Sequence, residues 1–460
     1  MRRVDVVILA AGLGKRMRSR RIKLLHQVAG RPMVAHVAEA ARALRPARLV
    51  AVVGHQADDV REALSGLCDR FAPQAEQRGT GHAVLAAAPL LRSGKGSALV
   101  VLSGDVPAVR ASTLRALVAR HRRSRAALTF VSTLVPDPSG YGRVVRDGAG
   151  RVARIVEERD ATPEERRIRE INAGIYCADR AALLAVLGSS RPDNAQGEYY
   201  LTDAVHRLLA RGARVAAVLH PESEEVLGVN TRAELARANA ALYARAAEAL
   251  QERGVTLLDP ARSWIDARAR VGRDSVIWPD VVIEGASVLG EDNVVRPGCR
   301  LRNVVTGRGV EIRDHCVLDD ARLGDGTVVG PFAHLRPGTV LEAGSRVGNF
   351  VEVKKSRLGR GTKAMHLTYL GDATIGPGCN IGAGTITCNY DGVRKNPTTL
   401  DAGVFIGSDT QLIAPVRVGK GAYVAAGSTV TNDVPPGALA IARGKQRNVE
   451  GWVARRRRKR

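Results

Sequence analysis

Aliphatic residues recur every six positions through much of the C-terminal half of the chain. The repeat forms three series: Val271, Ile277, Ile283, Leu289, Val295 and Leu301; Leu323, Val329, Leu335, Leu341, Val347 and Val353; and Leu400, Ile406, Leu412, Val418, Val424 and Val430. An α-helix would place apolar residues three to four positions apart, and an amphipathic strand would place them two apart. A period of six instead predicts a parallel β-helix, in which each hexapeptide is one short strand and turn and three hexapeptides close one coil around a shared aliphatic core.

The composition agrees with such a core but does not identify a binding partner. Aromatic residues make up 3% of the 460 residues, which suits an interior of stacked valine, isoleucine and leucine, and the length predicts two or three domains. The net charge of +24 attracts nucleic acids and phosphorylated small molecules alike. Because the arginines are spread over the whole chain, the charge does not choose between these partners.

Cysteine usage and hydropathy favour the cytoplasm. The six cysteines lie far apart, without the close spacing of a metal site, so we expect free thiols in a reducing compartment. No apolar run approaches the ~20 residues of a membrane span, and the run at 4–11 leads into Gly12 and Lys15 without a signal-peptide cleavage pattern. We therefore expect a cytoplasmic protein with no membrane partner.

The N-terminal half alternates strand-like segments with helix-length stretches such as 33–43 and 112–122. The strand-like segments are short apolar runs at 4–9, 49–53, 99–102 and 128–131. This alternation predicts a doubly wound (Rossmann-like), mostly parallel α/β sheet. Ligands of such sheets bind beyond the carboxyl ends of the strands.

Two segments at those strand ends have the chemistry of a phosphate or metal site. The first strand runs into a turn with Gly12, Gly14, Lys15 and Arg16, where glycine lets the backbone approach an anion and the cations supply charge. The turn is neither a Walker A loop nor a complete GxGxxG. Asp105 follows the strand at 99–102, where a metal-binding carboxylate is expected, although an isolated aspartate there is equally a turn residue.

Seven motifs in this half carry a family resemblance. They are 9–17 together with Lys23, 74–82, Gly104-Asp105, 140–143, 155–157, 170–172 and 228–230. In this order they resemble the sugar-nucleotidyltransferase family. Joined to the hexapeptide repeat, they make nearly the whole chain similar to the bacterial members of that family that are both N-acetylglucosamine-1-phosphate uridylyltransferases and glucosamine-1-phosphate N-acetyltransferases.

The resemblance implies a nucleotidyltransferase domain at 1–230 and a left-handed parallel β-helix with acetyltransferase activity at 254–445. Between them, residues 231–253 carry Ala, Leu, Arg and Glu at helical spacing, which predicts a linking helix. Thr231 and Glu234 have the spacing of a capping box, and Gly254 provides the stop. The basic tail at 446–460 is expected to be solvated.

The resemblance also implies the residues of a first site, which would bind UTP, N-acetylglucosamine-1-phosphate and Mg²⁺. The nucleotide residues are Leu9, Ala10, Ala11, Gly12, Gln74, Gly79, Thr80, Ser103 and Gly104, with Gln74, Gly79 and Thr80 around the uracil. The sugar is held by Gly142, Glu157 and Asn172, and the metal by Asp105 and Asn230. Arg16 and Lys23 carry the triphosphate charge while the sugar phosphate attacks the α-phosphorus in line and pyrophosphate leaves.

Two residues depart from the family pattern. The family commonly has proline before the lysine, where this chain has Ile22, and an aromatic residue before Gly104-Asp105, where this chain has Ser103. We expect a less rigidly placed Lys23 and one changed packing contact near the nucleotide. His82, although it follows the glycine-rich turn, is expected to be structural.

Polar side chains in the middle of the repeat suggest a second site, and the segment 389–397 interrupts the repeat as a surface loop would. By resemblance, His366 is the general base of acetyl transfer to glucosamine-1-phosphate, because an imidazole pKa of about 6.5 lies near working pH, and Glu352 orients it. Arg336 and Lys354 hold the sugar phosphate. The remaining implied residues are Tyr369 and Asn380 for the sugar, and Ala383, Asn389, Tyr390, Ser408, Ala426 and Arg443 for acetyl-CoA.

One coil cannot present all these residues to one substrate, and the resemblance implies a homotrimer with pockets between subunits. The leading hypothesis is thus a two-site enzyme that makes UDP-N-acetylglucosamine, a precursor of peptidoglycan and lipopolysaccharide. A nucleotidyltransferase with a merely structural or regulatory β-helix is the first alternative. A basic nucleic-acid-binding scaffold is the second, and it lacks a recognisable reading motif and a base-stacking aromatic cluster.

Overall fold

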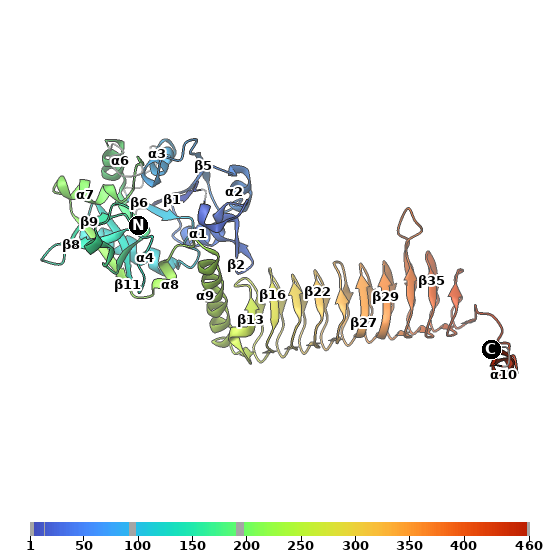
Figure 1. The fold of residues 1–460 in the computed structure, drawn as a ribbon. Helices are drawn as coiled ribbons and strands as arrows, with labels where there is room; N and C mark the ends of the chain where they lie inside the picture. Colours follow the sequence, from blue (N-terminus) through green and yellow to red (C-terminus); the bar gives the residue numbers. More distant parts are fainter. Residues whose placement is uncertain (1–3, 13, 92–97, 190–196, 458–460) are drawn as a thin grey trace. The chain divides into compact units, whose positions relative to one another are not determined.

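The computed structural model describes residues 4–12, 14–91, 98–189 and 197–457. The chain divides into two compact units, an N-terminal unit at Met1–Leu242 and a C-terminal unit at Tyr243–Arg460. The dividing point falls within helix α9 (Arg232–Gln251). Figure 1 shows the N-terminal unit as a sheet with helices around it and the C-terminal unit as a stack of short strands.

The N-terminal unit is built on one mixed sheet with the strand order β11-β7-β10-β6-β1-β4-β5. β10 runs antiparallel to β6 and β7, while the β1, β4, β5 and β6 pairings are parallel, as is β11 with β7. The strands are β1 (Asp5–Ala10), β4 (Arg48–Val53), β5 (Arg70–Pro73), β6 (Ala98–Ser103), β7 (Leu128–Leu134), β10 (Glu170–Asp179) and β11 (Val215–His220), with β8 (Arg143–Arg146) and β9 (Val152–Val156) as a hairpin beside β10. The predicted strands and the mostly parallel sheet are confirmed.

Helices cover both faces of this sheet because the buried strands are apolar on both sides. In β1, Val6 and Ile8 join one core with α1, α2 and α4, whereas Val7 joins the other core with α3, α6 and α7. The helices are α1 (Met33–Arg42), α2 (Ala57–Ala63), α3 (Thr80–Leu91), α4 (Ala111–Ser124), α5 (Pro163–Arg166), α6 (Arg180–Gly188), α7 (Asp203–Ala210) and α8 (Ser223–Val226). Short segments complete the unit: η1 (Lys15–Met17), η2 (Lys23–Leu25), β2 (Gln27–Val28) and β3 (Arg31–Pro32).

The C-terminal unit is a parallel β-helix, as the six-residue repeat predicts. Val276 pairs with Val294 eighteen positions further on, so three hexapeptides make one coil. All eighteen residues of the three aliphatic series are buried in one continuous core. The strands of one face are β14 (Arg270–Val271), β17 (Val288–Leu289), β20 (Val305–Thr306), β23 (Arg322–Leu323), β26 (Val340–Leu341), β28 (Arg357–Leu358), β30 (Ala373–Ile375), β33 (Thr398–Leu400) and β36 (Val416–Val418).

The other two faces share a second set of strands, because β27 and β29 run continuously around a corner. This set comprises β12 (Thr256–Leu257), β13 (Ser263–Ile265), β15 (Val276–Ile277), β16 (Val281–Glu284), β18 (Val294–Val295), β19 (Arg300–Arg302), β21 (Glu311–Ile312), β22 (Val317–Asp319), β24 (Val328–Val329), β25 (His334–Leu335), β27 (Arg346–Lys354), β29 (Lys363–Gly371), β31 (Asn380–Ile381), β32 (Ile386–Cys388), β34 (Phe405–Ile406), β35 (Gln411–Ile413), β37 (Tyr423–Val424), β38 (Thr429–Val430) and β39 (Leu439–Ala440). A 3-10 turn, η3 (Pro260–Arg262), lies near the start of the unit, and α10 (Trp452–Arg457) lies in the basic tail.

Changes in coil length explain why the repeat breaks into three series. Arg300 pairs with Val317, seventeen positions on, so one residue is missing from that coil. Asn380 pairs with Phe405, twenty-five positions on, because the segment 389–397 is inserted between β32 and β33. The insertion projects from the stack as a hairpin loop (Figure 1), which confirms the predicted surface loop.

Three further observations bear on the sequence analysis. The α9 capping box is present, since Thr231 Oγ1 accepts from Glu234 N at 3.2 Å and Glu234 Oε2 accepts from Thr231 N at 2.8 Å. All six cysteines are free thiols. Within the described ranges, none of the helices has the length and apolar character needed to cross a membrane.

Candidate active sites

A cavity of about 580 Å³ lies at the carboxyl ends of β1 and β6. It is lined by Leu9, Ala11, Gly12, Lys23, Leu24, Gln74, Gln77, Gly79, Thr80, Ala83, Ser103, Asp105, Glu157, Glu198 and Tyr200. Ten of these were predicted from the sequence. Ala10 is buried in the sheet core, and Gly104 lies beneath the cavity, where its N–H donates to the Leu9 carbonyl at 3.0 Å.

Lys23 and the two predicted metal ligands meet at one point of this cavity. The Lys23 ammonium lies 2.5 Å from Asp105 Oδ2 and 2.8 Å from Asn230 Oδ1. Ser103 Oγ donates to the other carboxylate oxygen of Asp105 at 2.6 Å. Burial pushes the pKa of Asp105 upward, but the Lys23 ammonium and the Ser103 hydroxyl outweigh burial and hold it below its usual value. Asp105 is therefore ionised at neutral pH.

These oxygens have the character of a magnesium site. Mg²⁺ prefers oxygen ligands and commonly takes one or two from the protein, with phosphate and water in the remaining positions. A carboxylate oxygen and an amide oxygen that converge on one cation fit this demand. No cluster of three His, Cys, Asp or Glu residues suited to a metal occurs in the described part of the chain.

The predicted uracil residues form the opposite wall of the cavity. The buried Gln74 donates to the Gly79 carbonyl at 3.3 Å and contacts His82 Nδ1 at 3.0 Å, which gives His82 a structural partner. Gly79 has a φ of +99°, and a Cβ there would collide with the Tyr199 carbonyl, so glycine is required. Thr80 Oγ1 accepts from Leu201 N at 2.9 Å.

Gln77 is a wall residue that the sequence analysis did not select. Its Nε2 donates to the Ala11 carbonyl at 2.8 Å and thereby ties the uracil wall to the glycine-rich turn. The sequence feature that could have identified Gln77 is its position within the motif 74–82.

The three predicted sugar residues lie together on the β8–β9–β10 side. Asn172 N donates to the Gly142 carbonyl at 2.8 Å, and a Cβ on Gly142 would lie 3.5 Å from the Glu157 carboxylate. Thr202 donates to Glu157 Oε1 at 2.8 Å. Burial raises the pKa of Glu157 despite this hydrogen bond. The Arg16 guanidinium, which is exposed, lies close to Gly140, beside this group.

Both departures from the family pattern introduce hydrogen bonds. Ser103 contacts Asp105 as described, so the change at this position affects a proposed metal ligand rather than only packing. Ile22 has φ −60° and ψ 151°, a conformation open to proline, and its N–H donates to Gln56 Oε1 at 2.8 Å, which proline could not do.

In the C-terminal unit, the coil register brings the predicted phosphate-binding residues together. Glu352 pairs with Tyr369, and Arg336 forms an ion pair with Glu352 at 2.7 Å. The Lys395 ammonium, from the inserted loop, lies beside Lys354 and lowers the pKa of Lys354. Lys395 is a cation that the sequence analysis did not select, because nothing in a loop sequence shows where the loop folds back.

The structure assigns a different partner to His366 than the one expected. His366 Nδ1 lies 2.8 Å from Asn349 Oδ1, and the two residues pair in the coil register. Glu352 contacts Arg336, so within this chain Asn349 rather than Glu352 is the residue at hydrogen-bond distance from the His366 ring. The orienting role expected of Glu352 stays a prediction. The period of seventeen residues between these coils was the signal that could have found Asn349.

The predicted acetyl-CoA residues follow one another down successive coils. Leu367, next to His366, accepts at its carbonyl from Gly384 N at 3.1 Å, next to Ala383. The Ala383 carbonyl accepts from Asp409 N, and the Ser408 carbonyl accepts from Gly427 N. Arg443 Nη1 donates to the Ala426 carbonyl at 2.6 Å. Ala383, Ser408, Ala426 and Arg443 therefore form a column that begins below His366.

The other predicted residues do not all reach this column within one chain. Asn389 Nδ2 donates to Asp372 Oδ2 at 2.6 Å and lies 3.5 Å from the Tyr369 hydroxyl. Tyr390 is exposed in the loop. Asn380 pairs with Lys363 and thus lies on a different face of the coil from Tyr369, which pairs with Glu352.

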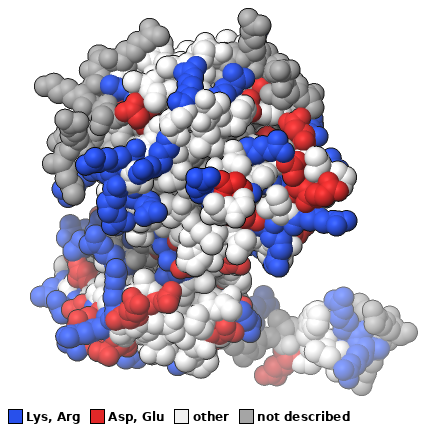
Figure 2. Space-filling model, turned by 90° about the vertical axis from the view of Figure 1, so that its left-hand side faces the viewer, with Lys and Arg blue, Asp and Glu red and all other residues white. Residues whose placement is uncertain are grey.

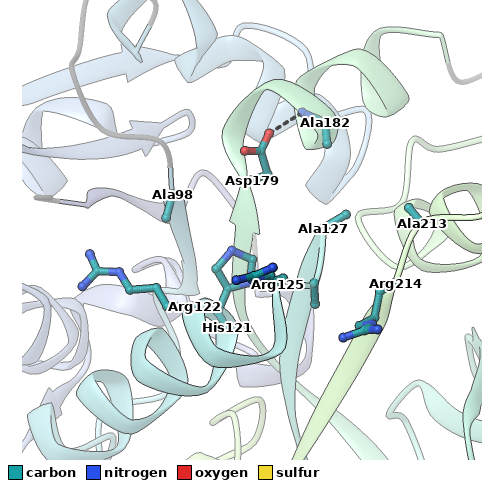
Figure 3. Close-up of a pocket in the computed structure, with 10 residues that line it drawn as sticks. Ala98, His121, Arg122, Arg125, Ala127, Asp179, Ala182, Ala213 and Arg214 are labelled. Carbon is teal, nitrogen blue, oxygen red and sulfur yellow. Dashed lines mark hydrogen bonds between the residues drawn. The ribbon is translucent and has the colours of Figure 1, made fainter.

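A second hollow in the N-terminal unit contains none of the predicted residues. It has a volume of about 480 Å³ and is lined by Arg122, Arg125 and Arg214 together with His121 and several alanines (Figure 3). Ala98 begins β6, so this hollow lies at the amino ends of the parallel strands, opposite the edge where such sheets bind ligands. Arg214 donates to the Ser124 carbonyl at 2.8 Å and Asp179 caps α6, which gives both a structural role.

Comparisons with known proteins find relatives over the whole length of the chain. A MobA-like NTP transferase domain matches residues 6–172. A protein of Pelobacter propionicus named "Bifunctional protein GlmU" is 49% identical over 460 residues, covering 100% of each chain. Proteins with the same name from Geobacter metallireducens and a Geobacillus species are 50% and 47% identical, with 98% of this chain and 98% and 97% of their own lengths covered.

Proposed function

Because the chain belongs to the family of bifunctional GlmU proteins, we propose that its two units catalyse two successive steps of UDP-N-acetylglucosamine synthesis. The C-terminal unit transfers an acetyl group from acetyl-CoA to glucosamine-1-phosphate. The N-terminal unit then transfers a uridylyl group from UTP to N-acetylglucosamine-1-phosphate and releases pyrophosphate. The product serves cell-wall and peptidoglycan synthesis.

The convergence of Asp105, Asn230 and Lys23 supports the proposal for uridylyl transfer. A phosphate oxygen of the sugar phosphate attacks the α-phosphorus of UTP, and the bond to pyrophosphate breaks in line. Asp105 and Asn230 would hold Mg²⁺, which would supply neutralisation of phosphate charge. Lys23 leaves these two oxygens and pairs with the triphosphate, together with Arg16, while Gln74, Gly79 and Thr80 hold the uracil. Glu157, Gly142 and Asn172 hold the sugar against the same cavity.

The hydrogen bond between His366 and Asn349 supports the proposal for acetyl transfer. An amide oxygen only accepts, so Nδ1 of His366 carries the hydrogen and Nε2 has a lone pair available to the substrate. The substrate amine attacks the thioester carbonyl carbon, and His366 Nε2 takes a proton from the nitrogen. The carbon–sulfur bond breaks, and the leaving thiolate of coenzyme A takes this proton from His366 and departs as the thiol.

A cluster of cations supports the choice of a phosphorylated sugar for this site. Arg336, Lys354 and Lys395 lie around Glu352 and Tyr369, and a lowered pKa of Lys354 reflects the repulsion between Lys354 and Lys395. A bound phosphate would relieve that repulsion. Glu352 holds Arg336 in place and in this way acts on the phosphate rather than on the base.

Exposed apolar side chains at one corner of the coils support a homotrimer. Phe332, Phe350 and Leu367 are 48%, 57% and 62% exposed and have φ of +52°, +55° and +47°. His315 stacks on Phe332 at 5.2 Å between ring centroids, and Phe332 stacks on Phe350 at 5.5 Å. Bulky residues rarely adopt this conformation, and it costs of order 1–3 kcal/mol each. This apolar corner lies beside Asn349 and His366, where a second copy of the chain would both cover it and bring Asn380 or Tyr369 to the same pocket.

The nucleic-acid alternative lacks a recognisable reading motif and a base-stacking aromatic cluster. Figure 2 shows Lys and Arg side chains over much of one face, with Asp and Glu side chains beside some of them, so the charge does not choose a partner. A cytoplasmic location follows from the substrates UTP and acetyl-CoA, which bacteria hold in that compartment.

The proposal is tested with purified protein, glucosamine-1-phosphate, acetyl-CoA, UTP and Mg²⁺, with free thiol and pyrophosphate followed separately. We expect pyrophosphate release to require prior thiol release. His366→Ala should abolish thiol release, and pyrophosphate release should persist when N-acetylglucosamine-1-phosphate is supplied directly. Unchanged thiol release in this variant would instead favour a structural β-helix.

A further inference from the structure

The segment that leads to Lys23 has little regular structure of its own. Residues 18–22 join η1 to η2, and Arg18 has a φ of +48°. Residues 18–21 are exposed, whereas Ile22 is buried. Lys23, which follows directly, nevertheless places its ammonium within hydrogen-bond distance of Asp105 and Asn230. Some contact has to hold the backbone in front of it.

Gln56 supplies such a contact with both ends of its carboxamide. Its Oε1 accepts from the Ile22 N–H at 2.8 Å, and its Nε2 donates to the Arg20 carbonyl at 3.3 Å. Because one partner is a donor and the other an acceptor, the orientation of the amide is determined. The side chain therefore clamps two backbone groups in the three residues before Lys23.

Gln56 is itself fixed to the core of the N-terminal unit. It precedes α2 with a φ of +52°, and its carbonyl accepts from Val60 N at 3.2 Å. Val60 and Leu64 are fully buried in the core that also contains Ile22 and Leu24. The clamp thus connects the segment to a rigid part of the sheet domain.

We propose that Gln56 is a positioning residue for Lys23 in uridylyl transfer; this rests on the function proposed for the N-terminal unit. Proline at position 22 would fix φ near −65° and would need no partner for an N–H. Isoleucine leaves φ free and leaves a partly buried N–H to be satisfied. The Gln56 amide accepts from the Ile22 N–H and restrains the backbone on both sides of it. Gln56 thus supplies the constraint that a proline ring would supply, without contacting the substrate.

A shift of this segment reaches the phosphate-binding turn as well as the ammonium. A Cβ on Gly14 would collide with the Lys23 Cβ, so the turn packs directly on the Lys23 backbone. A displacement of about 1 Å of a group that positions reactants costs of order 10²-fold in rate. The loss of one clamp should cause part of such a shift.

The test uses the full-length chain and compares Gln56→Gly with Gln56→Glu. Glycine tolerates φ +52° without strain, so it removes the amide and leaves the start of α2 relaxed. Glutamate keeps an oxygen acceptor for the Ile22 N–H, loses the longer contact to Arg20 and turns a second carboxylate oxygen toward the Arg20 carbonyl, where it can rotate away into solvent. We expect kcat for pyrophosphate release to fall about tenfold in Gln56→Gly and less than threefold in Gln56→Glu, in line with the loss of one or two hydrogen bonds. Thiol release by the other unit should be unchanged in both.

Rescue by proline separates positioning from a general structural role. Ile22→Pro should restore pyrophosphate release to the Gln56→Gly protein to within about twofold, because the ring then supplies the constraint. Arg45→Gly is the matched control, since Arg45 is exposed with φ +51° and should leave kcat unchanged. Equal losses in Gln56→Gly and Gln56→Glu, or wild-type activity in Gln56→Gly, would overturn the proposal. Absence of pyrophosphate release from the unmodified protein would instead overturn the proposed function.

Discussion

Replacing Asp105 by asparagine removes one charge from the first site while keeping the shape of the side chain. Asp105 and Lys23 are 2.5 Å apart with side chains only 15% and 13% exposed. At an effective dielectric constant of 20, two unit charges at this distance attract each other by about 7 kcal/mol, most of which offsets the cost of burying them. Breaking such a pair by removing one partner typically costs about 3–5 kcal/mol.

Asparagine retains an oxygen that can accept from the Lys23 ammonium. We therefore expect the free energy of unfolding of the N-terminal unit to fall by about 2–3 kcal/mol, less than for complete loss of the ion pair. For a unit of this size the melting temperature should fall by roughly 4–12 °C. Catalysis should suffer more, since the Mg²⁺ site loses its carboxylate and metal ions contribute several kcal/mol to phosphoryl transfer. Pyrophosphate release should fall by about 10³-fold or more, or at least about 4 kcal/mol.

The assay follows pyrophosphate and free thiol from the same Asp105→Asn protein at a temperature below both melting transitions. Thiol release reports on the C-terminal unit and should match the unmodified protein. Pyrophosphate release above a tenth of the original rate would refute the role of Asp105 as a metal ligand. A parallel loss of thiol release with both units folded would refute the division of labour between them.

Three further predictions address the remaining residues. Burial raises the folded-state pKa of Glu157 above its ordinary 4.5, so the contribution of this carboxyl group to stability is full below about pH 4.5 and is lost as pH rises through the folded pKa. Glu157→Gln should therefore raise the melting temperature at pH 8 and not at pH 4. Equal shifts of the melting temperature at both pH values would contradict this reasoning. Asn349→Ala should lower kcat for thiol release about tenfold while the KM for acetyl-CoA changes little, because the His366 ring loses its hydrogen bond to Asn349. Full activity in this variant would show that Asn349 does not orient His366. Phe350→Asp should convert the proposed trimer to monomers in analytical ultracentrifugation and abolish thiol release but not pyrophosphate release. A sedimentation coefficient equal to that of the unmodified protein would show that this corner is not in an interface.

The β-helix was predictable because its core repeats one chemical requirement in every coil. Val276 and Val294 occupy equivalent positions, so a single aliphatic period describes the whole unit. The mixed sheet was only partly predictable. Its parallel strands are continuous apolar runs, but β10 returns antiparallel between β6 and β7, and strand direction leaves no periodic signal in a sequence.

Site residues divided in the same way. Asp105 and Lys23 were found because a strand end and a motif mark them, and the structure brings them together. Asn349 and Gln56 were missed because each contacts a residue far away in sequence, His366 and Ile22 respectively. Ser103 was interpreted as one changed packing contact, because its hydrogen bond to the Asp105 carboxylate becomes visible only in the structure.

The cap of α9 bears on any attempt to separate the two activities into shorter polypeptides. Glu234 Oε2 accepts from the Asn230 backbone N–H at 2.6 Å as well as from Thr231. A fragment that stops at Asn230 would retain every ligand named for uridylyl transfer. Asn230 would then be the terminal residue, without the hydrogen bond from its backbone N–H to Glu234. A cut placed several turns downstream would preserve the anchor.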